Sequence, residues 1–165
     1  MAKKKLSRDQ KRKQKKQRRA RRLSSPSQRL IERMRRKGTE VKFVRNPRGM
    51  RKMSEVLHEF LAPYWDIPED EETMKKLIAT AVTAWNLALL PESERPRHLV
   101  KLAKVLPREL REDFYAIIGE LVERKEKYFA RYDRVIVDYE VVERGDTWNF
   151  SVLSTLPSQK PDEEA

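Results

Sequence analysis

The sequence predicts a mainly α-helical protein with a small β element, an α+β fold of one compact body behind a basic N-terminal arm. Three observations lead to this class. Residues 3–22 contain only two apolar side chains, Leu6 and Ala20. From Met53 onward, apolar residues recur at three- and four-residue spacing, as they do on the buried faces of helices. From residue 134 the pattern changes to the alternation typical of strands.

The chain divides into four predicted segments. They are a disordered polybasic arm at residues 1–24, a basic helix and turn linker at 25–52, a compact helical domain ending in a β-hairpin at 53–156, and a disordered acidic tail at 157–165. The arm has no apolar face whose burial could offset the entropy of ordering its backbone, so we expect it to be disordered in the free protein. Its Lys, Arg and Gln residues favour a helix once phosphates neutralise their mutual repulsion.

A short helix is predicted behind the arm, in the stretch SSPSQRLIERMRRKG. Ser25 is its expected N-cap, and Pro26 occupies the first helical position. Gln28 completes a capping box with Ser25, and Gly38 follows the last turn. These signals bound the helix at both ends.

Two patterns connect this helix to the body. Residues 39–44, TEVKFV, are a candidate edge strand. Residues 46–49, NPRG, have Pro in the second place and Gly in the fourth, as a type I turn prefers. The linker is therefore expected to contain a strand followed by a turn.

A bundle of about four helices is expected in the body, each bounded by Pro or by acidic residues in its first turn. They cover, in order, Ser54 to Pro63, Glu69 to Leu90, the stretch after Pro96 and the stretch after Pro107. The apolar stripe of the second helix is broad, which places that helix at the centre and Trp85 in the core. Gly119 in the fourth helix is expected to let a neighbouring helix approach closely.

A β-hairpin is predicted at the end of the body, from residues 134–142 and 147–155 with the connection 143–146 between them. Alternate residues of the first strand are expected to share its inner face: Val135, Val137, Tyr139 and Val141. The partner strand is expected to supply Trp148, Phe150 and Val152. Because a two-stranded hairpin alone is marginally stable, it should pack on the helices or pair with residues 39–44.

Charge is distributed very unevenly along the chain. The whole sequence has 38 Lys and Arg against 26 Asp and Glu, a net charge of +12. Residues 1–52 hold 23 basic and three acidic residues, a balance of +20, whereas residues 53–165 hold 15 basic and 23 acidic residues, a balance of −8. A polycation gains free energy by releasing the counterions condensed on a nucleic acid. The basic segment therefore indicates nucleic-acid binding, with the body positioning it.

The residues expected to contact phosphates are basic side chains of the arm, the short helix and the turn. RNA is favoured over DNA because arginine-rich segments fold on RNA and no DNA groove-reading motif is present. The arm has no aromatic residue to stack on bases, so its binding should not depend on sequence. The predicted set is Lys3, Lys4, Lys5, Arg8, Lys11, Arg12, Lys13, Lys15, Lys16, Arg18, Arg19, Arg21, Arg22, Arg33, Arg35, Arg36, Arg45, Arg48, Arg51 and Lys52.

The sequence offers little that could carry catalysis. It has no Cys, and its two histidines, His58 and His98, fall in separate expected helices. We therefore expect no metal site, no cofactor and no enzymatic activity. Acidic pairs such as Glu112 and Asp113 fall in first helical turns, where interaction with the helix dipole accounts for them. A non-enzymatic RNA-binding or ribosome-associated protein is the predicted function.

A second function stays open, that of a protein-interaction adaptor. In that case the acidic body binds a protein partner, with Trp65 of PYWDIP as the expected contact, and the arm localises the protein to nucleic acid or an anionic membrane. We find neither a signal-peptide pattern nor an apolar run long enough to span a membrane. A cytoplasmic location is expected, with the nucleus or nucleolus as the alternative in a eukaryote. The oligomeric state is left open.

Overall fold

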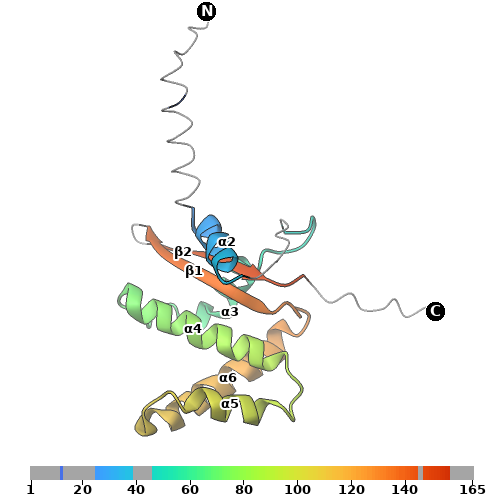
Figure 1. The fold of residues 1–165 in the computed structure, drawn as a ribbon. Helices are drawn as coiled ribbons and strands as arrows, with labels where there is room; N and C mark the ends of the chain where they lie inside the picture. The colour runs from blue at the N-terminus through green and yellow to red at the C-terminus, as the bar shows by residue number, and fades with distance from the viewer. Residues whose placement is uncertain (1–11, 13–24, 39–45, 145–146, 157–165) are drawn as a thin grey trace, which may run out of the picture. The chain divides into compact units, whose positions relative to one another are not determined.

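The computed structural model describes residues 12, 25–38, 46–144 and 147–156. The chain separates into two compact units, Met1–Arg45 and Asn46–Ala165. The elements of the described residues are α2 (Pro26–Arg36), α3 (Met53–Phe60), η1 (Ala62–Tyr64), α4 (Glu71–Ala88), α5 (Arg95–Ala103), η2 (Arg108–Leu110), α6 (Arg111–Phe129), β1 (Ile136–Arg144) and β2 (Thr147–Ser154). The predicted class, mainly α-helical with a small β element, is confirmed (Figure 1).

Three predicted segments fall outside the described residues. They are the arm at 1–24 apart from Arg12, the candidate strand at 39–44 and the tail at 157–165. The disorder expected for the arm and the tail, and the strand expected in the linker, therefore stay predictions.

The helix α2 of the first unit begins and ends where its sequence signals predict. Ser25 is the N-cap, and its Oγ accepts a hydrogen bond from the backbone N–H of Gln28 at 3.4 Å. Pro26 occupies the first turn, where its missing N–H leaves no bond unmade. At the other end, Gly38 has a φ of +70°, which glycine adopts without strain.

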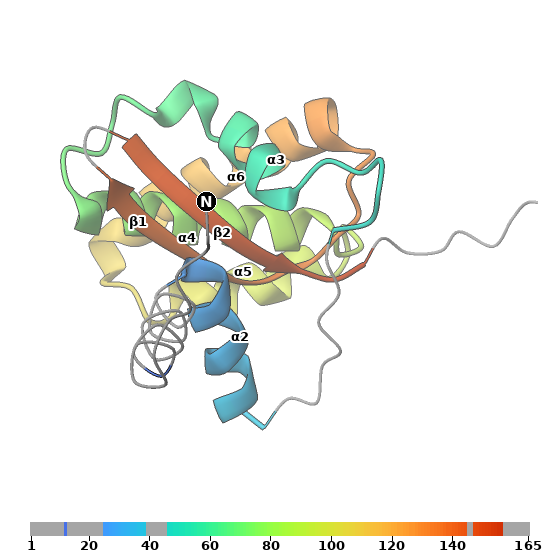
Figure 2. The same cartoon turned by 90° about the horizontal axis from the view of Figure 1, so that it is seen from above.

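The second unit is arranged in layers around α4. Its hairpin lies over α3 and α4, with β2 packed on α3 and β1 packed on α4 (Figure 2). On the other side of α4 lie α6 and α5 (Figure 1). The largest fully buried side chains come from α3, α4 and α6 and the residue after α3: Trp85, Phe60, Leu57, Leu61, Met74, Ile78, Ile118, Leu121 and Val56. The four predicted body helices and the core position of Trp85 are thus confirmed.

Two neighbouring residues of α4 hold the start of the hairpin. The indole Nε1 of Trp85 donates a hydrogen bond to the backbone oxygen of Arg134 at 2.9 Å. The side chain of Asn86 makes two bonds to Ile136: Nδ2 donates to the backbone oxygen at 2.8 Å, and Oδ1 accepts from the backbone N–H at 2.9 Å. Asn86 therefore satisfies both backbone groups of the first residue of β1, much as a neighbouring strand does.

The predicted inner face of β1 is wrong in its first part. Ile136 is 2 % exposed, whereas Val135 and Val137 are 39 % and 46 % exposed. The pairing with β2 is irregular between Ile136 and Asp138, where one extra residue is inserted. An inserted residue moves every following side chain to the opposite face of the strand. The prediction assumed a regular strand through residue 137. It therefore placed Val135 and Val137 on the inner face, where the structure has Ile136.

Beyond this irregularity the predicted pairing is confirmed. Val141 is buried and lies opposite Phe150, and Tyr139 lies opposite Val152. Pairing continues to the end of β1, so the connection between the strands has two residues, 145–146, rather than the four expected.

The predicted turn is displaced by one residue. The backbone N–H of Met50 donates to the oxygen of Pro47 at 3.2 Å, so the turn covers residues 47–50 rather than 46–49. Gly49 is then its third residue and has a φ of +81°, as a type II turn requires and a type I turn does not. The Asn46 side chain closes the turn by donating to the oxygen of Met50 at 2.5 Å.

Gly119 does not serve the purpose expected of it. A Cβ atom at this exposed position of α6 meets no described atom within 4 Å. No described helix therefore approaches α6 closely at Gly119, and the prediction of a close approach is wrong.

The short helix η1 is linked to α6 by a hydrogen bond between side chains. The hydroxyl of Tyr64 donates to Oε1 of Glu120 at 2.6 Å. Burial of the phenol is the larger cause, and this hydrogen bond the second, of a rise in the pKa of Tyr64 to about 12. The neutral phenol, which can donate to the carboxylate, is therefore favoured in the folded state.

Replacing Tyr64 by Phe is expected to lower the free energy of unfolding near pH 7 by about 1 kcal/mol, because it removes a hydrogen bond but keeps the ring. The folded pKa lies above the ordinary value of 10.0, so the contribution of the hydroxyl is complete below pH 10 and is lost as the pH rises toward about 12. Urea unfolding should therefore give a smaller difference between wild type and Tyr64→Phe near pH 10.5 than near pH 7. Tyr115→Phe is the matched control, because the Tyr115 hydroxyl makes no hydrogen bond within the described residues. Equal losses of unfolding free energy in both variants would show that the hydrogen bond from Tyr64 to Glu120 does not stabilise the fold.

Candidate nucleic-acid interface

Most of the predicted arm contacts lie outside the described residues. Of the thirteen arm residues in the predicted set, the structure describes Arg12, which is helical and exposed. Arg45 of the linker is also outside the described residues. The contacts expected of these residues therefore stay predictions.

The three predicted arginines of α2, Arg33, Arg35 and Arg36, are all exposed. Arg36 makes an ion pair with Glu32, one turn earlier, with 3.3 Å between Nη2 and Oε1. Both groups of this pair are exposed, so it contributes little to stability and can give way to a phosphate. The helix thus presents cationic side chains to solvent.

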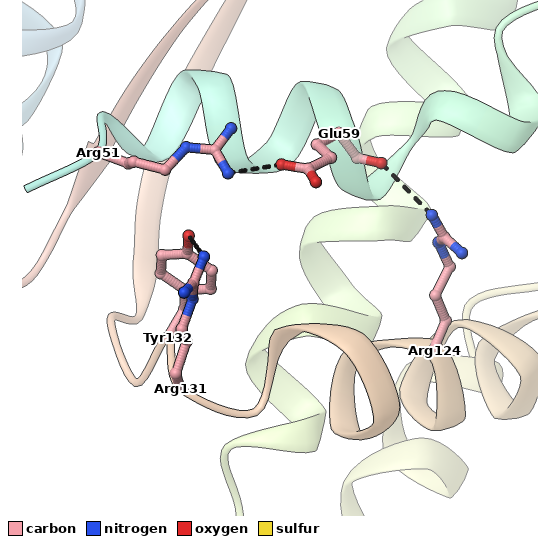
Figure 3. A network of polar contacts seen from close by, with 5 residues as sticks. All are labelled: Arg51, Glu59, Arg124, Arg131 and Tyr132. Atoms are coloured by element: carbon pink, nitrogen blue, oxygen red, sulfur yellow. Dashed lines mark hydrogen bonds and ion pairs between the residues drawn. The ribbon is translucent and has the colours of Figure 1, made fainter.

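The turn before α3 carries three predicted cations, Arg48, Arg51 and Lys52, and all three are exposed. Two of them have acidic partners on α3. Arg51 Nη1 lies 2.6 Å from Oε2 of Glu59 (Figure 3), and Lys52 Nζ lies 3.7 Å from Oε1 of Glu55. The bond to Glu59 raises the pKa of Arg51, so its guanidinium stays charged. A phosphate at this turn has to compete with two carboxylates.

Three arginines of the second unit cap helices instead. The last carbonyls of a helix have no partner within the helix, and an arginine can donate to two of them at once. The capping pairs are Arg124 with the carbonyls of Phe60 and Glu59 (the latter in Figure 3), Arg95 with those of Ala88 and Leu90, and Arg111 with those of Lys104 and Leu106, at distances of 2.9 to 3.5 Å. These guanidinium groups are engaged within the fold, at the ends of α3, α4 and α5.

A further cationic group lies on α5 and the residue after it, and its residues are not in the predicted set. Arg97, Lys101 and Lys104, here called the α5 row, stand at spacings of four and three residues and so share one face. All three are exposed, and with Pro96 and Val100 they line an open hollow of about 630 Å³. The spacing is visible in the sequence, but the negative balance of the whole body conceals it.

Trp65, the predicted partner contact, belongs to a half-buried aromatic cluster. Its ring stacks on that of Phe150, with 5.3 Å between centroids and 23° between planes, and lies 4.6 Å from the ring of His58. Its Nε1 donates to the backbone oxygen of His58 at 3.3 Å. Trp65 therefore links the end of η1 to α3 and β2, and part of its surface stays exposed.

The two histidines and the acids at the start of α4 form no metal-binding group within the described residues. His58 and His98 are both exposed, and the described residues contain no group of three or more His, Asp or Glu that could hold a metal ion. Asp70 is the N-cap of α4: its Oδ1 accepts from the backbone N–H of Thr73 at 2.7 Å, which lowers the pKa of Asp70. The two glutamates that follow pair with lysines one turn later. The acids at the start of α4 therefore stabilise the helix.

Lys125 is the charged side chain that the described part of the fold buries. It is 3 % exposed, and its Nζ lies 4.8 Å from the centre of the Trp85 ring. Burial lowers the pKa of Lys125, and the nearby carboxylates of Glu126 and Asp133 oppose this shift. The cation–π contact with Trp85 offsets part of the cost of burying the charge.

Comparisons with protein-family models, curated proteins and solved structures find no match for this chain. Within the ranges that the structure describes, no helix is both long enough and apolar enough to cross a membrane. The candidate interface is thus defined by the chain's own cationic groups: the arm, α2, the turn and the α5 row.

Proposed function

We propose that this protein is a non-enzymatic RNA-binding or ribosome-associated protein. The observation that supports the proposal is the balance of +20 over residues 1–52 against −8 over residues 53–165. The basic segment neutralises phosphates, and the acidic parts of the body repel the same backbone. Contact is thereby confined to the cationic groups, and the helical body positions the arm.

RNA is the proposed target, with DNA as the alternative. The exposed arginines of α2 and Arg48 of the turn supply contacts to phosphate, and such contacts carry no sequence information by themselves. The arm contains no aromatic residue. Binding through these residues is therefore independent of base sequence.

The proposal is tested by the salt dependence of binding to a short, labelled, single-stranded RNA. If about eight phosphates are neutralised, log affinity falls against log salt with a slope of about −6. Fluorescence anisotropy titrations between about 50 and 200 mM salt measure this slope. A second RNA of equal length and different sequence is the control and should give the same slope. Binding that does not depend on salt, or no binding at the lower salt concentration, would contradict the proposed RNA-binding function.

A second candidate is the protein-interaction adaptor, which the surface near η1 favours. Ile67 is 59 % exposed and lies two residues from the half-buried Trp65. Aromatic and apolar side chains at the surface are typical of protein contacts. Pulldown after nuclease treatment separates the two functions: partners that survive nuclease and are lost with Trp65→Ala favour the adaptor, and partners lost with the RNA favour RNA binding.

A further inference from the structure

We propose that the α5 row is a second phosphate-binding surface, one that holds an RNA backbone against the body in addition to the contacts of the arm. The inference rests on the proposed RNA-binding function and extends it to the second unit. The cations concerned are Arg97, Lys101 and Lys104, and the ligand chemistry is the sugar–phosphate backbone of a single strand.

The packing of α5 fixes the direction in which the row points. Ala103, on the opposite face of the helix, is 1 % exposed, and Leu99 packs against the core. Since a helix rises 1.5 Å per residue, the three cations extend over about 10 Å along the axis. The helix α5 lies on the side of the unit away from the hairpin (Figure 1). The row is therefore a short, straight line of charge on a fixed element.

The cations of the row differ from most others on the body because their charged groups have no partner among the residues that the structure describes. On α4, Lys75 and Lys76 pair with the glutamates one turn earlier, and Arg51 pairs with Glu59 before α3. The capping arginines donate to carbonyls. By contrast, the charged groups of the α5 row make neither an ion pair nor a hydrogen bond within the described residues. Their charges are available to an external anion without displacing a carboxylate.

The local charge balance also opposes that of the rest of the body. Residues 95–111 hold six basic residues and one acidic residue, a balance of +5 within a body whose total is −8. The hollow lined by the row has Pro96 and Val100 beside the cations, and Val100 is 51 % exposed. Cations beside an exposed apolar side chain suit a strand whose phosphates meet the charges while its sugars pack between them.

The test compares two full-length variants that lose the same number of charges. The first is Arg97→Gln/Lys101→Gln/Lys104→Gln, and the control is Lys75→Gln/Lys76→Gln/Lys127→Gln, which changes exposed lysines of α4 and α6. Loss of three phosphate contacts reduces the salt slope for single-stranded RNA by about 2 and the affinity in about 50 mM salt by at least about tenfold. The control should change the slope by less than about 1. Equal reductions in both variants would show an effect of net charge alone and overturn the inference.

Lysine acetylation followed by mass spectrometry locates the contact independently. Bound RNA is expected to protect Lys101 and Lys104 from acetylation and to leave Lys75 and Lys76 unchanged. RNA that binds without protecting the row overturns the inference and leaves the proposed function standing, whereas failure of the unmodified protein to bind RNA overturns both. Protection by phosphatidylserine vesicles but not by RNA would assign the row to a membrane surface and also overturn the inference.

Discussion

Removal of residues 1–37 is expected to weaken binding to single-stranded RNA at least about 100-fold in about 50 mM salt. The removed segment carries 18 of the 23 basic residues of residues 1–52. Each lost phosphate contact also removes its share of counterion release, so the salt slope should become much shallower. Anisotropy titrations of the full chain and of the shortened chain with the same RNA measure both quantities.

Two controls separate the charge of this segment from its length and from folding. A full-length chain in which the Lys and Arg residues of 1–37 are replaced by Gln removes the charge alone and should bind as weakly as the shortened chain. Circular dichroism and urea unfolding should show the shortened chain to be folded, because the second unit, Asn46–Ala165, contains its own core. Unchanged affinity and slope after removal would exclude the arm from RNA binding.

Replacing Asn86 by Leu is expected to lower the free energy of unfolding by about 3 kcal/mol. Leucine has a similar volume but can neither donate nor accept, so both the N–H and the C=O of Ile136 lose their partner. Ile136 is 2 % exposed, and each unpaired buried backbone group costs about 1–3 kcal/mol. Urea unfolding measures the loss.

The matched control for this variant is Asn149→Leu, the same substitution at an exposed position of β2. Its effect is expected to stay within about 0.5 kcal/mol. Hydrogen exchange adds a local measurement, because the amides of β1 should exchange faster in Asn86→Leu than in the control. Equal stabilities of the two variants would show that Asn86 does not hold the hairpin.

The helices α2 to α6 could be predicted because each carries its own local signals. Ser25 and Gly38 bound α2, and the apolar stripe of α4 places Trp85 in the core. Signals of this kind depend on residues within one or two turns, which is the range over which a sequence pattern is informative. The order of the described α-helices followed from them, whereas the short 3-10 helices η1 and η2 are not among the predicted elements.

The errors arose where structure depends on residues far apart in sequence. The alternation of β1 continues through residue 137, and only its pairing with β2 reveals the inserted residue that buries Ile136. The role of Asn86 depends on a strand 50 positions later, and an isolated Asn in a helical stretch carries no local sign of that partner. The displaced turn at Gly49 is a local error, because Gly is favoured at the fourth place of a type I turn and at the third place of a type II turn.

The candidate interface was predictable only as far as charge could be counted. A count identifies a basic segment, but it does not tell whether a given cation is already engaged. On the body, that distinction decides which cations are available to a ligand. Arg95 and Arg111 donate to carbonyls. Lys101 and Lys104 lie between these arginines in sequence, and their charged groups make no such contact in the described structure. The spacing of the α5 row becomes informative once the neighbouring arginines are assigned.

The capping arginines contribute in two separate ways. Each adds a positive charge to the protein, and each has a planar guanidinium group that donates to the carbonyls at a helix end. Exchanging Arg95, Arg111 and Arg124 for lysine keeps one positive charge at each position but removes the planar group that reaches two carbonyls together. On the α5 row the same exchange at Arg97 keeps a charge that faces solvent. The helix ends therefore depend on the shape of the guanidinium as well as on its charge, whereas the charged group of Arg97 makes no contact within the described residues that requires this shape.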